Sequence, residues 1–308
     1  MEIDPVAENV RLAVACGAEP AAALAVALVT ARPRSADEAF ALLDERRDEL
    51  RRLIAEPTPL RQLAPVEPEI DFQPPPARLR LDIGDHELRG RLLFGDILNK
   101  KSFLQATAWL VAGLDLSPSD ADLLGQAGVM MFYADPQIWP FAVARRAAVH
   151  GAGLAGSLIA ALATVCTPNL AAEAIAGFQA FLDRVDAEVA SGRTVEEVVA
   201  GLIAARERIP GVRRPVTDSD ERVPHLLATL ERYGRADGPS VRLMHRLGAA
   251  FEAQKGLRLN VAAPMGAMFR DLGFTPRATA AFTMTYFIVP LAANVAFVDE
   301  RALLGEER

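Results

Sequence analysis

The pattern of apolar and polar residues predicts helices along most of this chain. Apolar residues recur at the spacing of one helix face. The predicted helices span residues 39–54, 103–112, 117–133, 139–149, 154–165, 171–190, 194–208, 224–233, 240–255, 262–272 and 276–299. One alternating stretch, 78–83, predicts a short strand before a turn at Gly84 and Asp85, and the strand signal is negligible elsewhere. We therefore predict an all-α protein.

Breaks in the pattern divide the chain. Residues 1–55 are predicted to form an N-terminal helical region, in which Ser35 and Glu38 make a capping box before the first amphipathic run. Prolines recur from residue 56 to residue 76 and the helical spacing disappears, which predicts a linker. No internal repeat is visible along the chain.

Composition and charge exclude several classes of protein. At 51% hydrophobic and 24% charged residues, the chain is globular and not disordered. Its 33 Lys and Arg against 40 Asp and Glu give a net charge of −7, so no overall field attracts nucleic acid. The two cysteines, Cys16 and Cys166, suggest neither a disulfide framework nor a thiolate zinc site. With no signal peptide at the start, we expect a cytoplasmic protein.

Two uncharged stretches raise the question of a membrane. Residues 147–172 contain no acidic or basic residue except His150, and residues 278–298 contain none. Both stretches are long enough to span a bilayer. However, Pro168 and Pro290 interrupt them. Helices buried in an all-α core or at a dimer interface have the same composition. We expect no membrane insertion and a homodimer that buries 154–165 and the last helix.

Familiar motifs carry little chemistry here. Residues 151–156, Gly-Ala-Gly-Leu-Ala-Gly, match a dinucleotide pattern that requires a preceding strand, but residues 142–150 read as a helix. Close approach of two helices is the better interpretation of these glycines. None of the histidines forms a metal-binding pair: His86, His150, His225 and His245. His150 is the one histidine considered for chemistry, with packing as the alternative, and we predict no metal site and no bound cofactor.

The loop at residues 209–222 is the most informative segment. Pro210 and Gly211 end a helix, and three arginines follow: Arg213, Arg214 and Arg222. Arginines bind carboxylates and phosphates through paired N–H donors. The alternative is a solvated loop in which these arginines pair with nearby acids, namely Asp218, Asp220 and Glu221. Composition alone leaves both interpretations open.

Four segments, in order from about residue 87 to residue 300, resemble the citrate synthase family. Residues 210–215 and 220–222 resemble its Pro-Gly-Phe-Gly-His loop and the Asp-Pro-Arg that follows. Asn260 and Val261, before a helix with Arg-Asp-Leu-Gly at 270–273, resemble its Asn-Val-Asp segment. Residues 91–98, 102–103 and 110–113 are similar to its early segments. The resemblance implies a large helical domain, 77–175 and 262–308, and a smaller helical domain inserted at 176–261.

The chain departs from the family where catalysis takes place. In the family, one histidine donates a hydrogen bond to the thioester oxygen, an aspartate removes the α-proton, and a second histidine polarises the acceptor carbonyl. The resemblance places Asn169, Ala262 and Arg214 at these positions, and Val289 near an expected arginine. Arg222 keeps the family residue. Asn169 and Arg214 can still donate hydrogen bonds, but a carboxylate base is missing.

Two functions remain open. The chain is either a diverged acyltransferase or lyase that acts on an acyl-CoA or other acidic substrate, or a non-catalytic relative that binds such a ligand as a regulator or partner subunit. In the first case Asn169, Arg214 and His150 are the candidate catalytic residues, and decarboxylation of a malonyl-type thioester needs no base. The candidate substrate-binding residues are Gly211, Arg213, Arg222, Asn260 and Ala262. We expect one pocket between the two domains, with His150 at or near its wall, on which the following residues converge: Asn169, Arg213, Arg214, Arg222 and Ala262.

Overall fold

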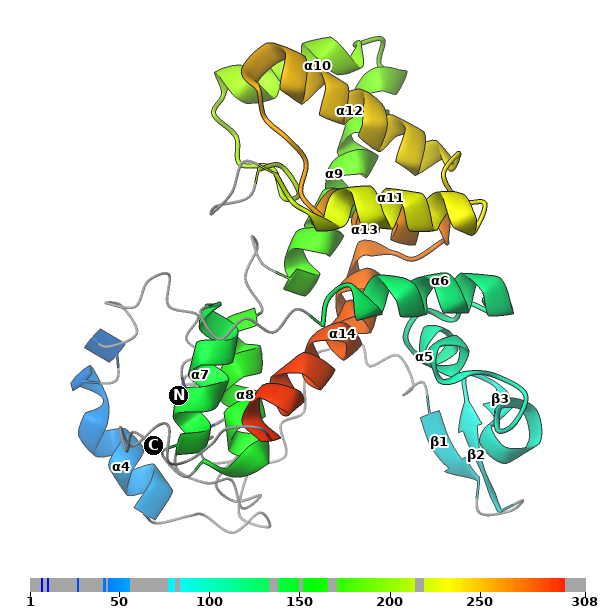
Figure 1. Ribbon diagram of the computed structural model, residues 1–308. Coiled ribbons are helices and arrows are strands. Elements are labelled where there is room, and N and C mark those ends of the chain that lie inside the picture. Colours follow the sequence, from blue (N-terminus) through cyan, green and yellow to red (C-terminus); the bar gives the residue numbers. More distant parts are fainter. Residues whose placement is uncertain are drawn as a thin grey trace, which may run out of the picture. The chain divides into compact units, whose positions relative to one another are not determined.

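The computed structural model describes residues 7, 10, 27, 41–42, 44–55, 77–80, 84–132, 138–149, 152–165, 171–213 and 219–296. The chain divides into two compact units. The first contains residues 1–71, 134–165 and 288–308, and the second contains residues 72–133 and 166–287. The predicted domain limits, which follow the family resemblance, remain a prediction. Figure 1 labels the elements of both units.

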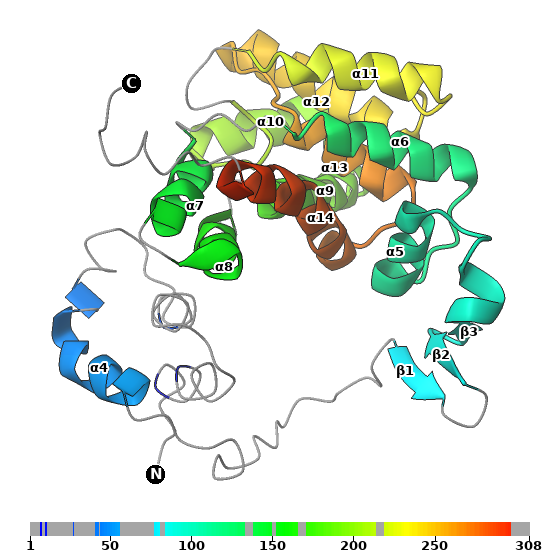
Figure 2. The ribbon, with the colours of Figure 1, turned by 60° about the horizontal axis from the view of Figure 1, so that its bottom comes forward.

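The first unit contains three labelled helices. Helix α4, Arg47–Ala55, follows a turn at Arg46, so the helix predicted over 39–54 is interrupted there. Helices α7, Trp139–Val149, and α8, Gly153–Val165, pack against each other (Figure 2). Because a helix and not a strand precedes the glycine motif, the dinucleotide interpretation is excluded. Gly153 begins α8 with a positive φ of 61°.

A small antiparallel sheet opens the second unit. Strands β1, Ala77–Arg80, β2, Asp85–Leu88, and β3, Arg91–Leu92, pair in the order β1-β2-β3. The expectation of a single strand is therefore wrong. Arg89 and Gly90 have φ of 47° and 80°, which is typical of a tight hairpin turn, but two such short strands show little alternation in the sequence. A short π-helix, η2, Leu93–Ile97, follows.

Helices build the rest of the second unit, and the all-α prediction is confirmed. They are α5, Phe103–Ala112; α6, Pro118–Val129; α9, Ala171–Ala190; α10, Val195–Ala204; α11, Arg222–Arg232; α12, Pro239–Lys255; and α13, Ala262–Asp271. Helix α14, Pro276–Ala296, belongs to the second unit up to Phe287 and to the first unit from Ile288. Ser102, Ser117 and Thr194 cap their helices with side-chain oxygens. Helices α6 and α10 end a few residues earlier than predicted, α10 with Arg206 at a positive φ of 52°.

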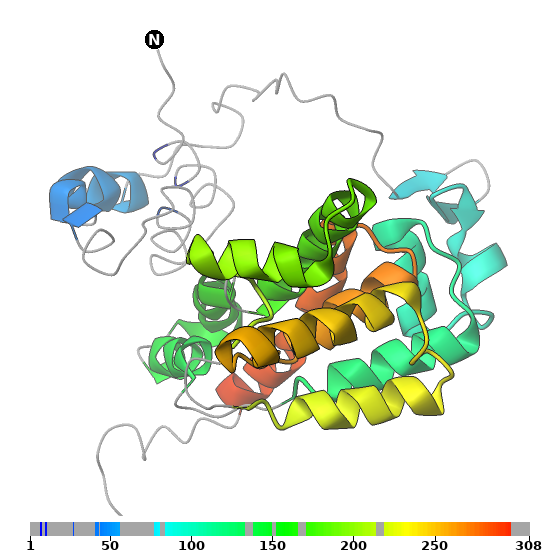
Figure 3. The ribbon, with the colours of Figure 1, turned by 90° about the horizontal axis from the view of Figure 1, so that it is seen from above.

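Helix α13 lies in the core of the second unit. Every residue from Ala262 to Phe269 is buried, and the helix packs on α9, α11 and α12. Helix α12 lies alongside α10 and against α13 (Figure 3). At Gly266 an added Cβ would lie 2.8 Å from the carbonyl oxygen of Ile175, so α9 and α13 approach closely. This packing places the first turn of α13 beside the loop that precedes α11.

Helix α14 is apolar, and one face of it belongs to this core. The Phe282 ring packs edge-on against Phe269 and Tyr286, and the Tyr286 hydroxyl donates to the carbonyl of Leu124. Among the described residues, α14 alone has the length and hydropathy to cross a membrane, and 39% of its most apolar window is buried. Buried core helices have the same properties, so this is weak evidence for a membrane span.

Candidate functional site

The loop after α10 and the segment before α13 lie side by side and are hydrogen-bonded to each other (Figure 1). Val212 forms an isolated bridge with Leu259. The Arg213 amide donates to the Arg258 carbonyl at 2.7 Å, and the Asn260 amide donates to the Gly211 carbonyl at 2.8 Å. Two segments almost fifty residues apart thus bring Gly211, Arg213 and Asn260 together, as the sequence analysis expected.

Gly211 fits where no other residue fits without strain. Its φ is 81°, and a Cβ there would lie 2.5 Å from Cδ2 of Phe178 and 3.2 Å from the amide nitrogen of Ala263. Only glycine adopts this conformation freely, and only glycine leaves room for the buried Phe178 ring. Gly211 therefore allows the loop to lie against both α9 and the first turn of α13.

Arg213 is exposed and has a positive φ of 66°. This conformation costs a non-glycine residue about 1–2 kcal/mol. Two neighbours hold it in place, because its amide donates to Arg258 and its carbonyl accepts a 2.9 Å bond from Nδ2 of Asn260. With the residues that the structure describes, the Arg213 guanidinium makes no ion pair. Its positive charge is therefore uncompensated by them.

Asp220 is a buried carboxylate that joins two helix starts. It accepts hydrogen bonds from Nε and Nη2 of Arg222, both at 2.8 Å, and from the Val261 amide at 2.9 Å. The Asp220 side chain is 0% exposed and that of Arg222 is 21% exposed. For Arg222, the interpretation of the loop arginines as partners of nearby acids is thus correct.

The pKa of Asp220 reflects this environment. Burial by itself raises the pKa, because a charged carboxylate is poorly solvated there, but the hydrogen bonds from Arg222 and Val261 outweigh it. The net pKa lies below its ordinary value. A carboxylate so stabilised as the anion is a weak proton acceptor, and Asp220 is therefore unsuited to the role of general base.

The lowered pKa predicts a specific loss of stability in acid. Because the unfolded chain holds the Asp220 proton more tightly than the folded one, protonation favours unfolding as the pH falls below about 5. Asp220→Asn lacks this titration. Urea unfolding from pH 7 to pH 3 should show the wild type more stable at neutral pH and the difference shrinking in acid. A difference that stays constant with pH would contradict the assignment.

Position 262 carries no proton-accepting side chain. Ala262 begins α13 and is 5% exposed. Its amide donates to Oδ1 of Asn260 at 2.9 Å, so Asn260 uses its side chain to hold both Arg213 and the start of α13. Asn260 is thus a structural link between the two segments. Of the carboxylates in the described parts of the chain, Asp220 is the one bonded to this helix start.

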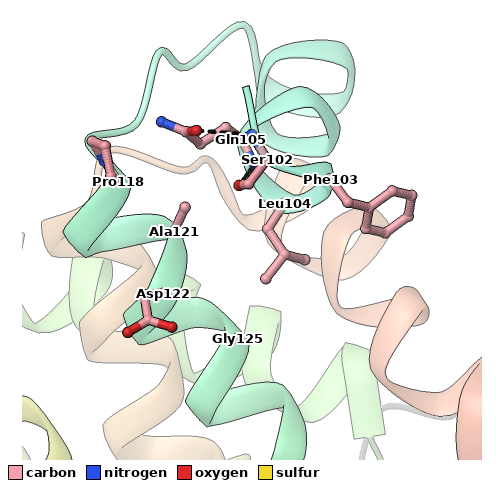
Figure 4. Close-up of a pocket in the computed structure, with 8 residues that line it drawn as sticks. All are labelled: Ser102, Phe103, Leu104, Gln105, Pro118, Ala121, Asp122 and Gly125. Carbon is pink, nitrogen blue, oxygen red and sulfur yellow. Dashed lines mark hydrogen bonds between the residues drawn. The ribbon is translucent and has the colours of Figure 1, made fainter. Parts of the chain in front are cut away.

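Two cavities of the second unit lie away from this site. One of about 270 Å³ lies between α5 and α6 (Figure 4). Its buried amide, Gln105, already bonds the Leu116 carbonyl and the Ser102 amide, and its carboxylate, Asp122, accepts from the Tyr233 hydroxyl. A groove of about 420 Å³ separates α6 from α11. Neither includes a predicted site residue.

Three predicted site residues lie outside the described residues: His150, Asn169 and Arg214. The convergence of the site residues on one pocket stays a prediction. Within the described ranges, no group of three or more His, Cys, Asp or Glu side chains is placed to hold a metal ion. The sequence analysis named Asp220 as a possible partner of the loop arginines but did not place it at the start of α13. The available signal was an acid two residues before an arginine at a helix start.

Comparison with known proteins agrees with this geometry. The family model of the citrate synthase C-terminal domain matches residues 95–300. The chain belongs to the citrate synthase family. No curated protein matches the sequence significantly. The predicted family resemblance is therefore confirmed, and with it the citrate synthase-like fold class.

Solved structures with the same fold include lyases and synthases. A citryl-CoA lyase from Hydrogenobacter thermophilus has a TM-score of 0.65 at 20% identity, with 74% of this chain and 86% of that chain covered. An ATP citrate lyase from Methanothrix soehngenii, in complex with citrate and coenzyme A, has a TM-score of 0.58 at 19% identity, with 90% of this chain and 48% of that chain covered. A citrate synthase from Thermotoga maritima has a TM-score of 0.52 at 19% identity, with 64% of this chain and 54% of that chain covered. At these identities the likeness shows the fold.

Proposed function

We propose that this chain is a diverged enzyme of the citrate synthase family that forms or breaks a carbon–carbon bond in an acyl-CoA or other acidic substrate. Ordinary citrate synthesis is not the proposed reaction. A CoA thioester would be a substrate, and no bound cofactor is proposed. The observation that carries the proposal is the hydrogen-bonded pairing of residues 211–213 with residues 258–260, since it joins the family's loop to the segment that leads into α13.

This site is rich in donors and lacks a base. Arg213 is exposed and uncompensated by the described residues, and one edge of Arg222 is left unused by Asp220. Ala262 cannot accept a proton, and Asp220 is a poor acceptor for the reasons given above. Such a set of groups stabilises negative charge that develops in a substrate, and does not create it by deprotonation.

A decarboxylative reaction fits such a site. In a malonyl-type thioester, the bond between the α-carbon and the carboxylate breaks, carbon dioxide leaves, and the electron pair remains as an enolate. No base is needed for this step. We propose that Asn169 donates to the thioester oxygen that gains charge and that Arg214 binds the acidic part of the substrate. The enolate carbon then takes up one proton to give acetyl-CoA, and His150 is the proposed proton donor. In a reaction that begins with deprotonation instead, His150 is the proposed base.

The test is a turnover assay with defined thioesters. Purified protein would be incubated with malonyl-CoA and, separately, with citryl-CoA, and the products followed by mass spectrometry. We expect acetyl-CoA from at least one of them, at a rate that Asn169→Ala reduces. Arg193→Ala, in the turn before α10, is the control and should leave the rate unchanged. Intact thioesters after incubation would contradict the proposed reaction.

A non-catalytic binding function is the second candidate. The alanine at position 262 favours it, because it replaces the carboxylate that the family resemblance places there as the base. As a regulator or partner subunit, the protein would bind an acyl-CoA or an organic acid without changing it. Saturable binding of acetyl-CoA or citrate with no product over hours would support this function against the enzymatic one.

The arginines of the loop should carry the affinity for an acidic ligand. Arg213→Ala and Arg214→Ala are each expected to weaken citrate binding by about 1.5–3 kcal/mol, which is the range for a hydrogen bond to a charged group. Isothermal titration calorimetry measures this. Arg206→Ala is the matched control, because Arg206 is also exposed with a positive φ of 52°. Equal losses in all three variants would show a general effect of charge and not a site.

We also propose a cytoplasmic homodimer. Among the described residues of the first unit, four large apolar side chains are exposed: Leu154 and Ile159 of α8, and Ile288 and Val289 of α14. Apolar surface of this kind is typical of protein interfaces. Light scattering at micromolar concentration should give the mass of two chains, and Ile159→Asp should lower it. A wild-type monomer would contradict the proposal.

A further inference from the structure

We infer that Asp220 is a positioning residue for Arg222: it holds one edge of the guanidinium so that the opposite edge, Nη1–Nη2, is the one that meets a ligand carboxylate. This inference rests on the proposed function for the ligand, but its geometric part does not. The motif resemblance does not distinguish a free arginine from one held in this way. The hydrogen bonds around Asp220 show that Arg222 is held.

The guanidinium of Arg222 has a limited set of donors. It carries five N–H groups in a planar fork. Nε and Nη2 each donate to a different oxygen of Asp220 at 2.8 Å, which is the parallel two-bond geometry of an arginine–carboxylate pair. One N–H of Nη2 and both of Nη1 remain. Nη1 lies 3.9 Å from the sulfur of Met131, a weak acceptor, so these donors are available to a ligand.

Asp220 in turn is held on both oxygens. Oδ1 also accepts the Arg222 backbone amide at 3.2 Å, and Oδ2 accepts the Val261 amide at 2.9 Å. The side chain is fully buried, so rotation would leave these donors without water to replace the lost bonds. The guanidinium is therefore fixed relative to the first turns of α11 and α13. Fixing a long side chain before the ligand arrives lowers the entropy lost on binding.

The Asp220–Arg222 pair has no net charge, so the effect of Asp220 on anion binding distinguishes a role in positioning from an effect of charge. A ligand carboxylate on the free edge of Arg222 is repelled by Asp220. If Asp220 acted only through its charge, Asp220→Asn would tighten the binding of an anion. If Asp220 positions Arg222, the same variant weakens binding, because one amide oxygen cannot accept from Nε, Nη2 and Val261 together and its NH₂ group faces donors.

The first experiment measures citrate binding by calorimetry. We expect Asp220→Asn to bind citrate about tenfold more weakly than the wild type, the equivalent of one lost hydrogen bond to a charged group. Arg222→Lys keeps the positive charge but not the planar pair of donors, and its affinity for citrate should fall by about the same factor. The variant with both substitutions should bind citrate only slightly more weakly than either single variant. Asp115→Asn is the matched control, since Asp115 also pairs with an arginine, Arg91, and should not change binding. Tighter binding by Asp220→Asn would overturn the inference.

The second experiment needs no ligand. The Nε–H group of Arg222 gives its own signal in ¹H–¹⁵N spectra, and its bond to a buried carboxylate should protect it from exchange with water. Asp220→Asn should speed that exchange about tenfold or more, because the Nε bond is lost. Unchanged exchange would overturn the positioning role. If the wild type does not bind citrate, the proposed acidic ligand is wrong while the exchange experiment still decides the positioning.

Discussion

Gly211→Ala is expected to lower the free energy of unfolding by about 3 kcal/mol. The left-handed conformation at φ 81° contributes about 1–2 kcal/mol, and overpacking against a buried ring contributes about 1–3 kcal/mol. The new Cβ would lie 2.5 Å from the ring of Phe178, a residue of α9 that is 0% exposed and therefore has no open space to move into. Urea unfolding followed by circular dichroism measures the change.

Gly234→Ala is the matched control for this substitution. Gly234 has a similar φ of 67°, but no atom lies within 4 Å of a Cβ placed there. Only the conformational cost applies, so the expected loss is about 1 kcal/mol. The difference between the two variants therefore measures the close contact of the loop with α9 and α13. Equal losses would mean that the loop does not pack as described.

Purified protein is expected to make no citrate from acetyl-CoA and oxaloacetate at a rate above background. Loss of a general base costs about 10²–10⁴-fold, and the family's two histidine positions are proposed to differ as well. Groups that act as a unit do not contribute additively, so no larger figure follows from their sum. A thiol-release assay measures the rate, with heat-denatured protein as background.

Rapid thiol release would show that the protein has a base in spite of the alanine at position 262. Loss of the reaction in Asp220→Asn would not identify Asp220 as that base, because the variant also releases Arg222. Rapid thiol release by a folded Asp220→Asn variant would exclude Asp220, and the base would then lie among the other carboxylates or be His150.

The sequence by itself determined most of the helices, because the signals that define them are local. Helices α5, α7 and α9 have the predicted bounds. The first of these is marked by a capping serine and by Gly113, which ends it at a φ of 71°. Strands β2 and β3 were missed because their pairing depends on the turn at Arg89 and Gly90 and on a partner across the sheet.

The candidate site divides in the same way. Residue types and their order were sufficient to indicate the family, the arginine loop and the missing carboxylate at Ala262. Only the tertiary structure decided that Arg222 faces Asp220, that Arg213 is exposed, and that Asn260 links the two segments. The physical reason is that a hydrogen bond depends on the position and direction of two groups in space. The sequence specifies which donors and acceptors exist, and the packing of α9 and α13 selects which of them meet.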